Sequence, residues 1–307
     1  MQPSEFLPPA TAATERVSPR FYDLDRWPAG DILLAMWEGQ LAAVAAVRAA
    51  LPALESAAAA ALPRLANDGR LVYAGAGTSG RIGVQDGAEL PPTFDWPEDR
   101  LVLLMAGGDT AFTRSIENAE DDRDAALRDV AGHGIGAADV VLGIAASGST
   151  PYTTTVIAES ARRGALTIGI ANSPGGALLA AASCPILVET GAEIIAGSTR
   201  LQAGTAQKIV LNLFSSLVMV RLGRVHRGLM VDMNARNAKL RQRAVRMLRQ
   251  LTGEDDATVR AALDAAGGRV KTAVLLLRGI GLAQADRLLA RHAGHLHAAL
   301  ADIGAGA

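Results

Sequence analysis

The chain has 307 residues, of which half are hydrophobic and a fifth are charged. This composition is that of a globular protein and excludes the low-hydrophobicity, high-charge class of disordered chains. Thirty basic and 31 acidic residues leave a formal net charge of −1, so no overall field attracts nucleic acid or an anionic membrane.

Three features bear on the compartment in which the protein works. The single Cys184 excludes an intramolecular disulfide and is typical of a reducing compartment. Residues 1–14 have no basic segment followed by an apolar core, so they do not resemble a secretory signal. The Ala-rich stretch over residues 41–62 is interrupted by charges and a proline, short of the roughly 20 apolar residues of a membrane span. We therefore expect a soluble, cytoplasmic protein with no membrane or nucleic-acid partner.

In chain order, the first predicted element is an Ala/Leu-rich stretch over residues 31–67, expected as amphipathic helices broken near Pro52. Five short, apolar, β-prone runs follow, at residues 71–74, 101–105, 140–145, 166–170 and 186–188. Helix-length stretches separate most of them, at residues 81–90, 111–130 and 152–163. This alternation predicts an α/β fold with a parallel sheet, whose strand C-termini lie along one edge.

The last third of the chain is predicted to be helical. Apolar residues recur at helical spacing over residues 200–222 and 231–251. After Gly253 the pattern changes to short helical segments punctuated by glycines, which predicts a small helical domain. The expected organisation is an N-terminal arm over residues 1–30, a main domain over 31–252 and the small domain over 253–307.

A glycine-rich loop, GAGTSGR, follows the first predicted strand at residues 75–81. It matches the G-x-G-x-x-G dinucleotide pattern, and Asp109 stands roughly where a ribose-binding acid is expected. A P-loop is excluded, because Arg81 follows the last glycine where that motif has lysine. The adjacent hydroxyls of Thr78 and Ser79 favour a phosphate monoester, held by these groups and by the N–H groups of the following helix.

A second hydroxyl-rich loop, SGSTP, follows the third predicted strand at residues 147–151. Because both loops come from strand ends at one edge, we expect them to meet and to surround a phosphate without a large basic cluster. The alternative is that both are ordinary strand-to-helix turns with N-cap residues. The predicted phosphate-binding residues are Gly77, Thr78, Ser79, Gly80, Ser147, Gly148, Ser149 and Thr150.

Both loops resemble those of the sugar-isomerase (SIS) domain family, whose hydroxyl-rich loops bind phosphosugars. Further motifs resemble its N-acetylmuramic acid 6-phosphate etherase subfamily in order and spacing. They are ELPPT at residues 89–93, AGG at 106–108, ENAED at 117–121, GSTR at 197–200, AGTAQK at 203–208, MVD at 230–232 and NAKL at 237–240. AGTAQK is the most specific. The resemblance covers residues 14–300, including a small, UBA-like helical C-terminal domain.

The resemblance implies a three-layer SIS-type domain, with a five-stranded parallel sheet flanked by helices. It also implies a carbon–oxygen lyase of the hydro-lyase type in amino-sugar catabolism and peptidoglycan recycling. Such an etherase removes D-lactate from N-acetylmuramic acid 6-phosphate by elimination at C2 and C3 followed by hydration, which leaves N-acetylglucosamine 6-phosphate. No metal or organic cofactor is implied. A homodimer with its site near the subunit interface is implied.

Glucokinase regulatory protein belongs to a related branch that binds phosphosugars without this reaction. A non-catalytic phosphosugar-binding regulator is therefore the alternative function, as is an etherase-like enzyme acting on a related phosphosugar.

The elimination requires a base for the C2 proton and an acid for the departing lactate oxygen, and carboxyl groups can serve as both. The resemblance assigns acid/base catalysis to Glu89, at the end of the first crossover helix, and a second catalytic role to Glu120, in the second crossover. Structural alternatives stay open: Glu89 as a helix-end carboxylate, and Glu120 as part of a solvated acidic face. The five histidines form no HExxH motif, so a metal site is not expected.

Ser198 and Lys208 are the remaining candidates for substrate contact. Arg200 and Lys208 are expected on one helix, where capping or subunit pairing is an equally open role for them.

Four positions depart from the subfamily's usual residues. Ser149 replaces an arginine, Asp109 a histidine, Gln202 a lysine and Ser18 an asparagine. Three of these changes remove positive or potentially positive charge, so recognition of the lactyl carboxylate or of the phosphate is expected to be altered.

Overall fold

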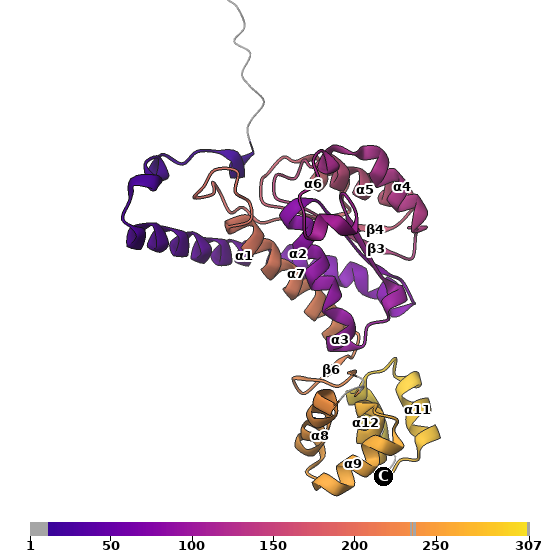
Figure 1. Ribbon diagram of the computed structural model, residues 1–307. Helices are drawn as coiled ribbons and strands as arrows, with labels where there is room; N and C mark the ends of the chain where they lie inside the picture. Colours follow the sequence, from indigo (N-terminus) through magenta and orange to yellow (C-terminus); the bar gives the residue numbers. More distant parts are fainter. Residues whose placement is uncertain (1–11, 234, 236–237, 306–307) are drawn as a thin grey trace, which may run out of the picture. The chain divides into compact units, whose positions relative to one another are not determined.

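The computed structural model describes residues 12–233, 235 and 238–305 (Figure 1). Residues 1–11, which belong to the stretch considered for a secretory signal, lie outside the described residues. Asn237 of the NAKL motif lies outside them as well. The chain divides into two units, one of residues 1–87 and 99–214 and one of residues 88–98 and 215–307. The expected domain limits at residues 31 and 253 stay predictions.

The first unit contains a five-stranded parallel sheet, which confirms the predicted fold class. Its strands are β1 (Leu71–Gly75), β2 (Leu101–Met105), β3 (Val140–Ala145), β4 (Leu166–Ala171) and β5 (Cys184–Leu187), in the order β2-β1-β3-β4-β5. Gly75, the last residue of β1, pairs with Met105 of β2 and with Ile144 of β3. The two hydroxyl-rich loops therefore leave neighbouring strands at the same edge of the sheet.

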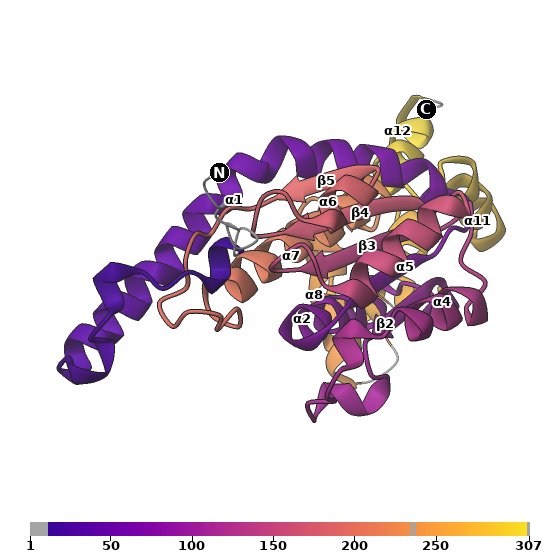
Figure 2. The same ribbon diagram turned by 90° about the horizontal axis from the view of Figure 1, so that it is seen from above.

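Helices cover both faces of this sheet and complete the three layers (Figure 2). On one face, residues of α4 (Arg123–Gly132), α5 (Pro151–Arg162) and α6 (Ala177–Ala181) form a core with alternate residues of β1, β2 and β3. On the other face, α1 (Ala29–Ala66) packs against β3, β4 and β5, and α2 (Gly77–Ala88) packs against Tyr73 and Ile144.

A partly buried ion pair joins the starts of the two strands that carry the loops. Arg70, next to β1, donates from Nε and Nη2 to the carboxylate of Asp139, next to β3, at 2.9 and 2.8 Å. Burial by itself raises the pKa of Asp139, but the hydrogen bonds from Arg70 and from the Gly136 N–H outweigh it, so the pKa lies below its ordinary value. The pair sets the relative position of β1 and β3, and hence of their opposite ends.

The predicted helix break near Pro52 is wrong, because α1 is a single helix of 38 residues that contains Pro52 and Pro63. A proline inside a helix costs about 3 kcal/mol, since one hydrogen bond is lost and the ring crowds the preceding turn. Pro52 lies on the exposed side of α1, where water can bind the freed carbonyl. The surrounding alanines, the best helix formers, sustain the helix.

The predicted helix over residues 111–130 is also largely wrong. Two short 3₁₀ turns, Asp109–Phe112 and Ala119–Asp121, precede α4, which begins only at Arg123. Asn118 between them has φ of 59°, which no helix accommodates. The Asp122 side chain accepts the Ala125 N–H at 2.8 Å and so caps α4 at this point.

Other boundaries differ less from the prediction. In the first crossover, α2 begins inside the glycine loop and the shorter α3 (Leu90–Phe94) follows it. The helix expected over residues 200–222 is α7 (Gln202–Arg221), so Arg200 lies before it. Further 3₁₀ turns are Ala13–Glu15, Pro19–Phe21, Leu24–Arg26 and Glu98–Arg100.

The second unit begins its own core after α7. A two-stranded hairpin, β6 (Val225–His226) and β7 (Leu229–Met230), lies between the two predicted helices, in residues for which the sequence predicted no element. The helix expected from Val231 is α8 (Ala238–Thr252). The predicted helical segments after Gly253 are α9 (Asp256–Ala265), α10 (Val270–Leu276), α11 (Leu282–Arg291) and α12 (Leu296–Ala305), which share one apolar core with α8.

By length and hydropathy alone, α1 and α7 are apolar enough to cross a membrane. Core helices of globular proteins pass the same test. Over half of the apolar stretch of α7 is buried inside the protein, as in a core helix, whereas one third of that of α1 is buried, on the side that packs along the sheet.

Candidate functional site

A cavity of about 400 Å³ lies at the ends of β1 and β3, where the two hydroxyl-rich loops meet. The predicted residues that line it are Gly77, Thr78, Ser79, Glu120, Ser147, Ser149 and Thr150. The structure therefore brings together both loops and one of the two candidate catalytic glutamates. Three strand-to-helix connections of the first unit contribute to this one cavity.

The first loop is shaped by close contact between glycines. A Cβ atom on Gly80 would lie 2.7 Å from the Gly75 carbonyl oxygen, so no other residue fits there without moving the loop. This contact seats the start of α2 on the end of β1. The Gly80 N–H donates to the Ala76 carbonyl at 3.0 Å, whereas the preceding N–H groups belong to the first helical turn and have no intrahelical partner. These groups and the helix dipole favour an anion.

The second loop turns at Gly148, which has φ of 69° and donates its N–H to Ala145 at 3.0 Å. The Ser149 N–H donates to Ser147 Oγ at 3.2 Å. Thr150 is the N-cap residue of α5, but its side chain makes no capping hydrogen bond. The N-cap alternative therefore does not account for this hydroxyl, which lines the cavity.

The remaining wall of the cavity is acidic. Glu15 and Asp121 line it together with Glu120, and no Arg, Lys or His among the described residues does so. Glu15 belongs to the N-terminal arm and lies against Gly197, where a Cβ atom would be 2.8 Å from Glu15 Oε2. Among the described residues, the positive ends of the helix dipoles are therefore what can attract a phosphate in this cavity.

A smaller cavity of about 200 Å³ adjoins the first and shares Gly77 and Glu120 with it. Arg114 and Arg81 line this second cavity. Arg81 Nε donates to the Ala111 carbonyl at 3.1 Å and so ties the segment before Glu120 to α2. Glu120 thus lies between the hydroxyl-rich cavity and one that contains two guanidinium groups.

Several predicted site residues do not line either cavity. Gly80 and Gly148 shape the loops rather than face the space between them. Lys208 is half-buried on α7, and Ser198 lies in the turn before that helix. Glu89 is exposed at the N-cap position of α3, in the second unit, and its side chain makes no capping hydrogen bond.

Among the four departures from the subfamily, only Ser149 lines the hydroxyl-rich cavity. Gln202 is buried, and its side-chain oxygen accepts the Ile194 N–H at 3.2 Å. The Gln202 N–H donates to the carboxylate of buried Glu193 at 2.9 Å. Asp109 begins a 3₁₀ turn, and Ser18 lines a separate apolar cavity. Of the predicted losses of positive charge, the one at Ser149 therefore lies at this cavity.

Sequence patterns did not single out Glu15, Asp121 and Thr199 as site residues, although all three line the cavity. A signal existed for Glu15, which lies at the start of the stretch, residues 14–300, over which the chain resembles the etherase subfamily. Among the residues that the structure describes, no three His, Cys, Asp or Glu side chains converge in a way that would hold a metal ion.

Two family models match the part of the chain that contains the sheet and both hydroxyl-rich loops. The glucokinase regulatory protein N-terminal SIS domain model matches residues 54–161, and the SIS domain model matches residues 124–217. A phosphoheptose isomerase from Francisella tularensis is similar in fold, with a TM-score of 0.49 at 20% identity, over 63% of this chain and 100% of that one.

Curated relatives match almost end to end. The N-acetylmuramic acid 6-phosphate etherase of Deinococcus radiodurans is 50% identical over 290 residues, which are 94% of this chain and 95% of that protein. The enzyme of the same name from Streptomyces avermitilis is 46% identical over 95% of this chain and 94% of that protein. On this similarity, the chain belongs to the N-acetylmuramic acid 6-phosphate etherase family.

Proposed function

We propose that this protein is a lyase that cleaves the D-lactyl ether of N-acetylmuramic acid 6-phosphate. Its products are N-acetylglucosamine 6-phosphate and D-lactate, and its role is in the catabolism and recycling of cell-wall amino sugars. The observation that carries the proposal is the meeting of two hydroxyl-rich loops and Glu120 in one cavity, in a chain whose relatives are etherases. A phosphosugar substrate and the cytoplasm as the site of action follow from this activity.

The phosphate binds between the loops, where Thr78, Ser79, Ser147 and Thr150 donate hydroxyl hydrogen bonds to it. The first-turn N–H groups of α2 add further donors, and the dipoles of α2 and α5 stabilise the negative charge. The acidic wall then borders the sugar, because three carboxylates beside a phosphate dianion would repel it.

The reaction proceeds from the open-chain sugar, whose C1 aldehyde makes the C2 proton acidic. A carboxylate removes this proton, a C2–C3 double bond forms, and the C3–O bond to lactate breaks as an acid protonates the departing oxygen. Water then adds its oxygen to C3 and a proton returns to C2. We assign the acid/base role at C2 to Glu89, on the strength of the ELPPT motif, and ring opening or the water step to Glu120.

The activity is tested by incubating the purified protein with N-acetylmuramic acid 6-phosphate and assaying D-lactate. In ¹⁸O-labelled water, the heavy oxygen should appear on the sugar and not on lactate, because the C3–O bond is the one that breaks. A non-catalytic regulator would bind the phosphosugar and release no lactate. Label found on lactate would instead indicate cleavage on the other side of the ether oxygen.

Alanine at Ser79 or Ser147 should weaken phosphosugar binding by roughly ten- to over a hundredfold, because a hydrogen bond to a charged group contributes about 1.5–3 kcal/mol. Ser56→Ala is a matched control: its hydroxyl is exposed on α1 and bonds to the Pro52 carbonyl. Calorimetric titration with N-acetylglucosamine 6-phosphate measures the effect. Equal affinity of the parent protein for phosphorylated and unphosphorylated sugar would contradict this phosphate site.

The active protein is a homodimer, and we place the site near its interface by resemblance to the family. Support comes from α1, where Leu34, Trp37, Leu41, Val44 and Leu51 are exposed at spacings of three, four and seven residues. These residues form one apolar stripe, of the kind that a second subunit covers. Val17 and Tyr22, on the arm that carries Glu15, are also exposed.

Sedimentation should give twice the mass of one chain. Trp37→Asp should shift the protein towards the monomer, because a charge cannot be buried in an apolar interface without a partner. The same change at Ser56, an exposed position of α1 that is not part of the stripe, should leave the dimer intact. A monomeric parent protein with full activity would contradict the proposal.

A further inference from the structure

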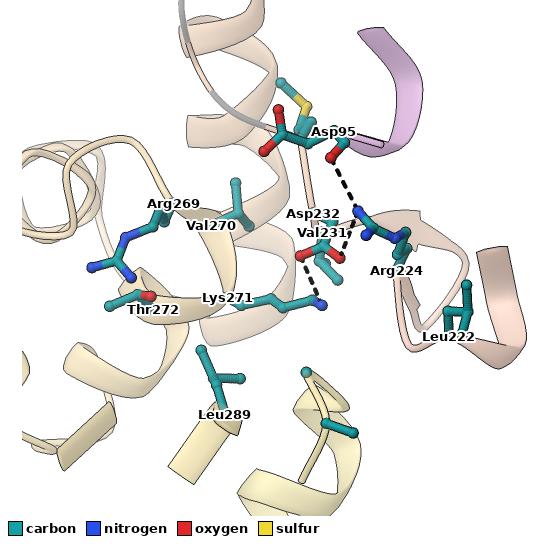
Figure 3. Close-up of a pocket in the computed structure, with 13 residues that line it drawn as sticks. Asp95, Leu222, Arg224, Val231, Asp232, Arg269, Val270, Lys271, Thr272 and Leu289 are labelled. Carbon is teal, nitrogen blue, oxygen red and sulfur yellow. Dashed lines mark hydrogen bonds and ion pairs between the residues drawn. The ribbon is translucent and has the colours of Figure 1, made fainter. Parts of the chain in front are cut away.

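The second unit contains a cavity of about 310 Å³ to which neither the sequence patterns nor the proposed reaction assigns a role (Figure 3). It lies among the segments just before and just after the β6–β7 hairpin, the start of α10 and the turn between α11 and α12. Its volume is at the lower end of the range for small-molecule sites. Leu222, Val231, Val270 and Leu289 supply apolar walls.

The polar side of this cavity is built on Lys271. The Lys271 side chain is only 7% exposed, and its Nζ lies 2.7 Å from Asp232 Oδ1. Arg224 Nη1 lies 3.5 Å from the other oxygen of the same carboxylate. Figure 3 shows both cations directed at Asp232, with Arg269 turned away from them. Lysine is almost never buried to this degree without a compensating charge.

Two cations share the carboxylate of Asp232. Arg224 and Lys271 both lie against it, whereas Arg269 pairs with Asp286 at 2.7 Å. The Asp95 carboxylate is turned away from Lys271 in Figure 3. Among the described ion pairs of this cavity, two positive charges therefore meet one negative charge at Asp232, and a further anion beside Lys271 would be favourable there.

Arg224 Nη1 already has several partners, whereas the ammonium group of Lys271 retains N–H donors. Arg224 Nη1 donates to the Phe94 carbonyl at 2.7 Å, and its guanidinium stacks on the Trp96 ring at 5.1 Å. An ammonium group has three N–H donors, and Asp232 is its partner for one. Gly294 lies beside Nζ, where a Cβ atom would be 3.4 Å from the nitrogen. Burial lowers the pKa of Lys271 from its ordinary value, an effect that Asp232 opposes.

We propose that this cavity is a second ligand site, which binds a small aliphatic monocarboxylate with its carboxylate on Lys271 and its tail against the apolar walls. A single negative charge balances the cluster, whereas a phosphate dianion would overcompensate it. Arg224 Nη1 donates to the backbone carbonyls of Phe94 and Asp95, so this nitrogen is not available for a bidentate contact with phosphate. The bound carboxylate links the segments that carry Asp232, Lys271 and Gly294, and so stabilises this unit.

The test is a calorimetric titration of the full-length protein with sodium propionate, in the absence of phosphosugar. The parent should bind with a Kd on the order of 1 mM. Lys271→Met keeps the apolar stem and removes the charge, and it should weaken binding at least about tenfold. Arg291→Met is the matched control, because Arg291 pairs with Asp302 on the exposed surface, and it should bind as the parent does.

A second variant covers the case in which Lys271→Met fails to fold. Asp232→Asn keeps Lys271 and removes the competing negative charge, so it should bind propionate at least as tightly as the parent. Loss of binding in folded Asp232→Asn, unchanged binding in folded Lys271→Met, or no saturable binding by the parent would overturn the proposal. Tighter binding of inorganic phosphate than of propionate would overturn the choice of ligand.

Ser147→Ala distinguishes propionate binding at this site from propionate binding in the hydroxyl-rich cavity. Propionate binding should be unchanged in that variant, and a loss there would mean that the probe occupies the other cavity. None of these outcomes depends on lactate release, so failure of this proposal and failure of the proposed reaction are separable.

Discussion

Changing Glu89 to Gln is expected to slow D-lactate release from N-acetylmuramic acid 6-phosphate by roughly 10²–10⁴-fold, which is the usual contribution of a general acid or base. An amide of the same shape can neither accept the C2 proton nor return it. Turnover by the parent in deuterated water should leave deuterium at C2 of the product, and the variant should lose this exchange together with lactate release. Phosphosugar binding should persist, because the phosphate is held by the two loops.

Glu98→Gln is the control for this experiment. Glu98 is an exposed carboxylate in the same 88–98 segment, and its loss should change the rate by no more than about twofold. An effect of Glu89→Gln below about tenfold would demote Glu89 to a structural role. Because its side chain makes no capping hydrogen bond to α3, a large loss of stability is not expected from the change.

Glu120→Gln is expected to lower product formation by roughly 100-fold or more, because Glu120 lines both the hydroxyl-rich cavity and the neighbouring one. The products tell its two possible roles apart. If Glu120 directs the water step, lactate release will exceed formation of N-acetylglucosamine 6-phosphate, since the unsaturated sugar accumulates. If Glu120 serves ring opening, both products will fall together.

Asp124→Asn separates this catalytic role from the solvated acidic face. Asp124 is exposed in the first turn of α4, within the same run of acidic residues, and it lines neither cavity. Its replacement should leave the rate within about twofold of the parent. Equal, small effects of Glu120→Gln and Asp124→Asn on the rate would indicate that Glu120 is part of a solvated acidic face and not catalytic.

The parallel sheet was predictable because its strands are covered on both faces. Such strands read as continuous apolar runs, and VVLGIA of β3 and LTIGIA of β4 are buried at every position. The hydroxyl-rich loops were predictable as well, because a strand, a small-residue turn and a helix follow one another without interruption. The sequence-based prediction failed in segments that show no such continuous pattern. The segment from Asp109 to Asp122 consists of turns whose conformation depends on Asn118, and the two-residue strands of the hairpin are too short to show any period.

The sequence by itself determined the fold class, the edge of the sheet at which the loops meet and the family to which the chain belongs. Each of these rests on local patterns or on motifs in fixed order. Only the tertiary structure decided which side chains share a space. Glu15 reaches the cavity by lying against Gly197, and Gln202 is withdrawn from it by its bond to Ile194. Lys271 is buried against Asp232, although a lysine is ordinarily a surface residue. Contacts such as those of Glu15 with Gly197 and of Lys271 with Asp232 depend on how whole elements pack, and no local pattern records them.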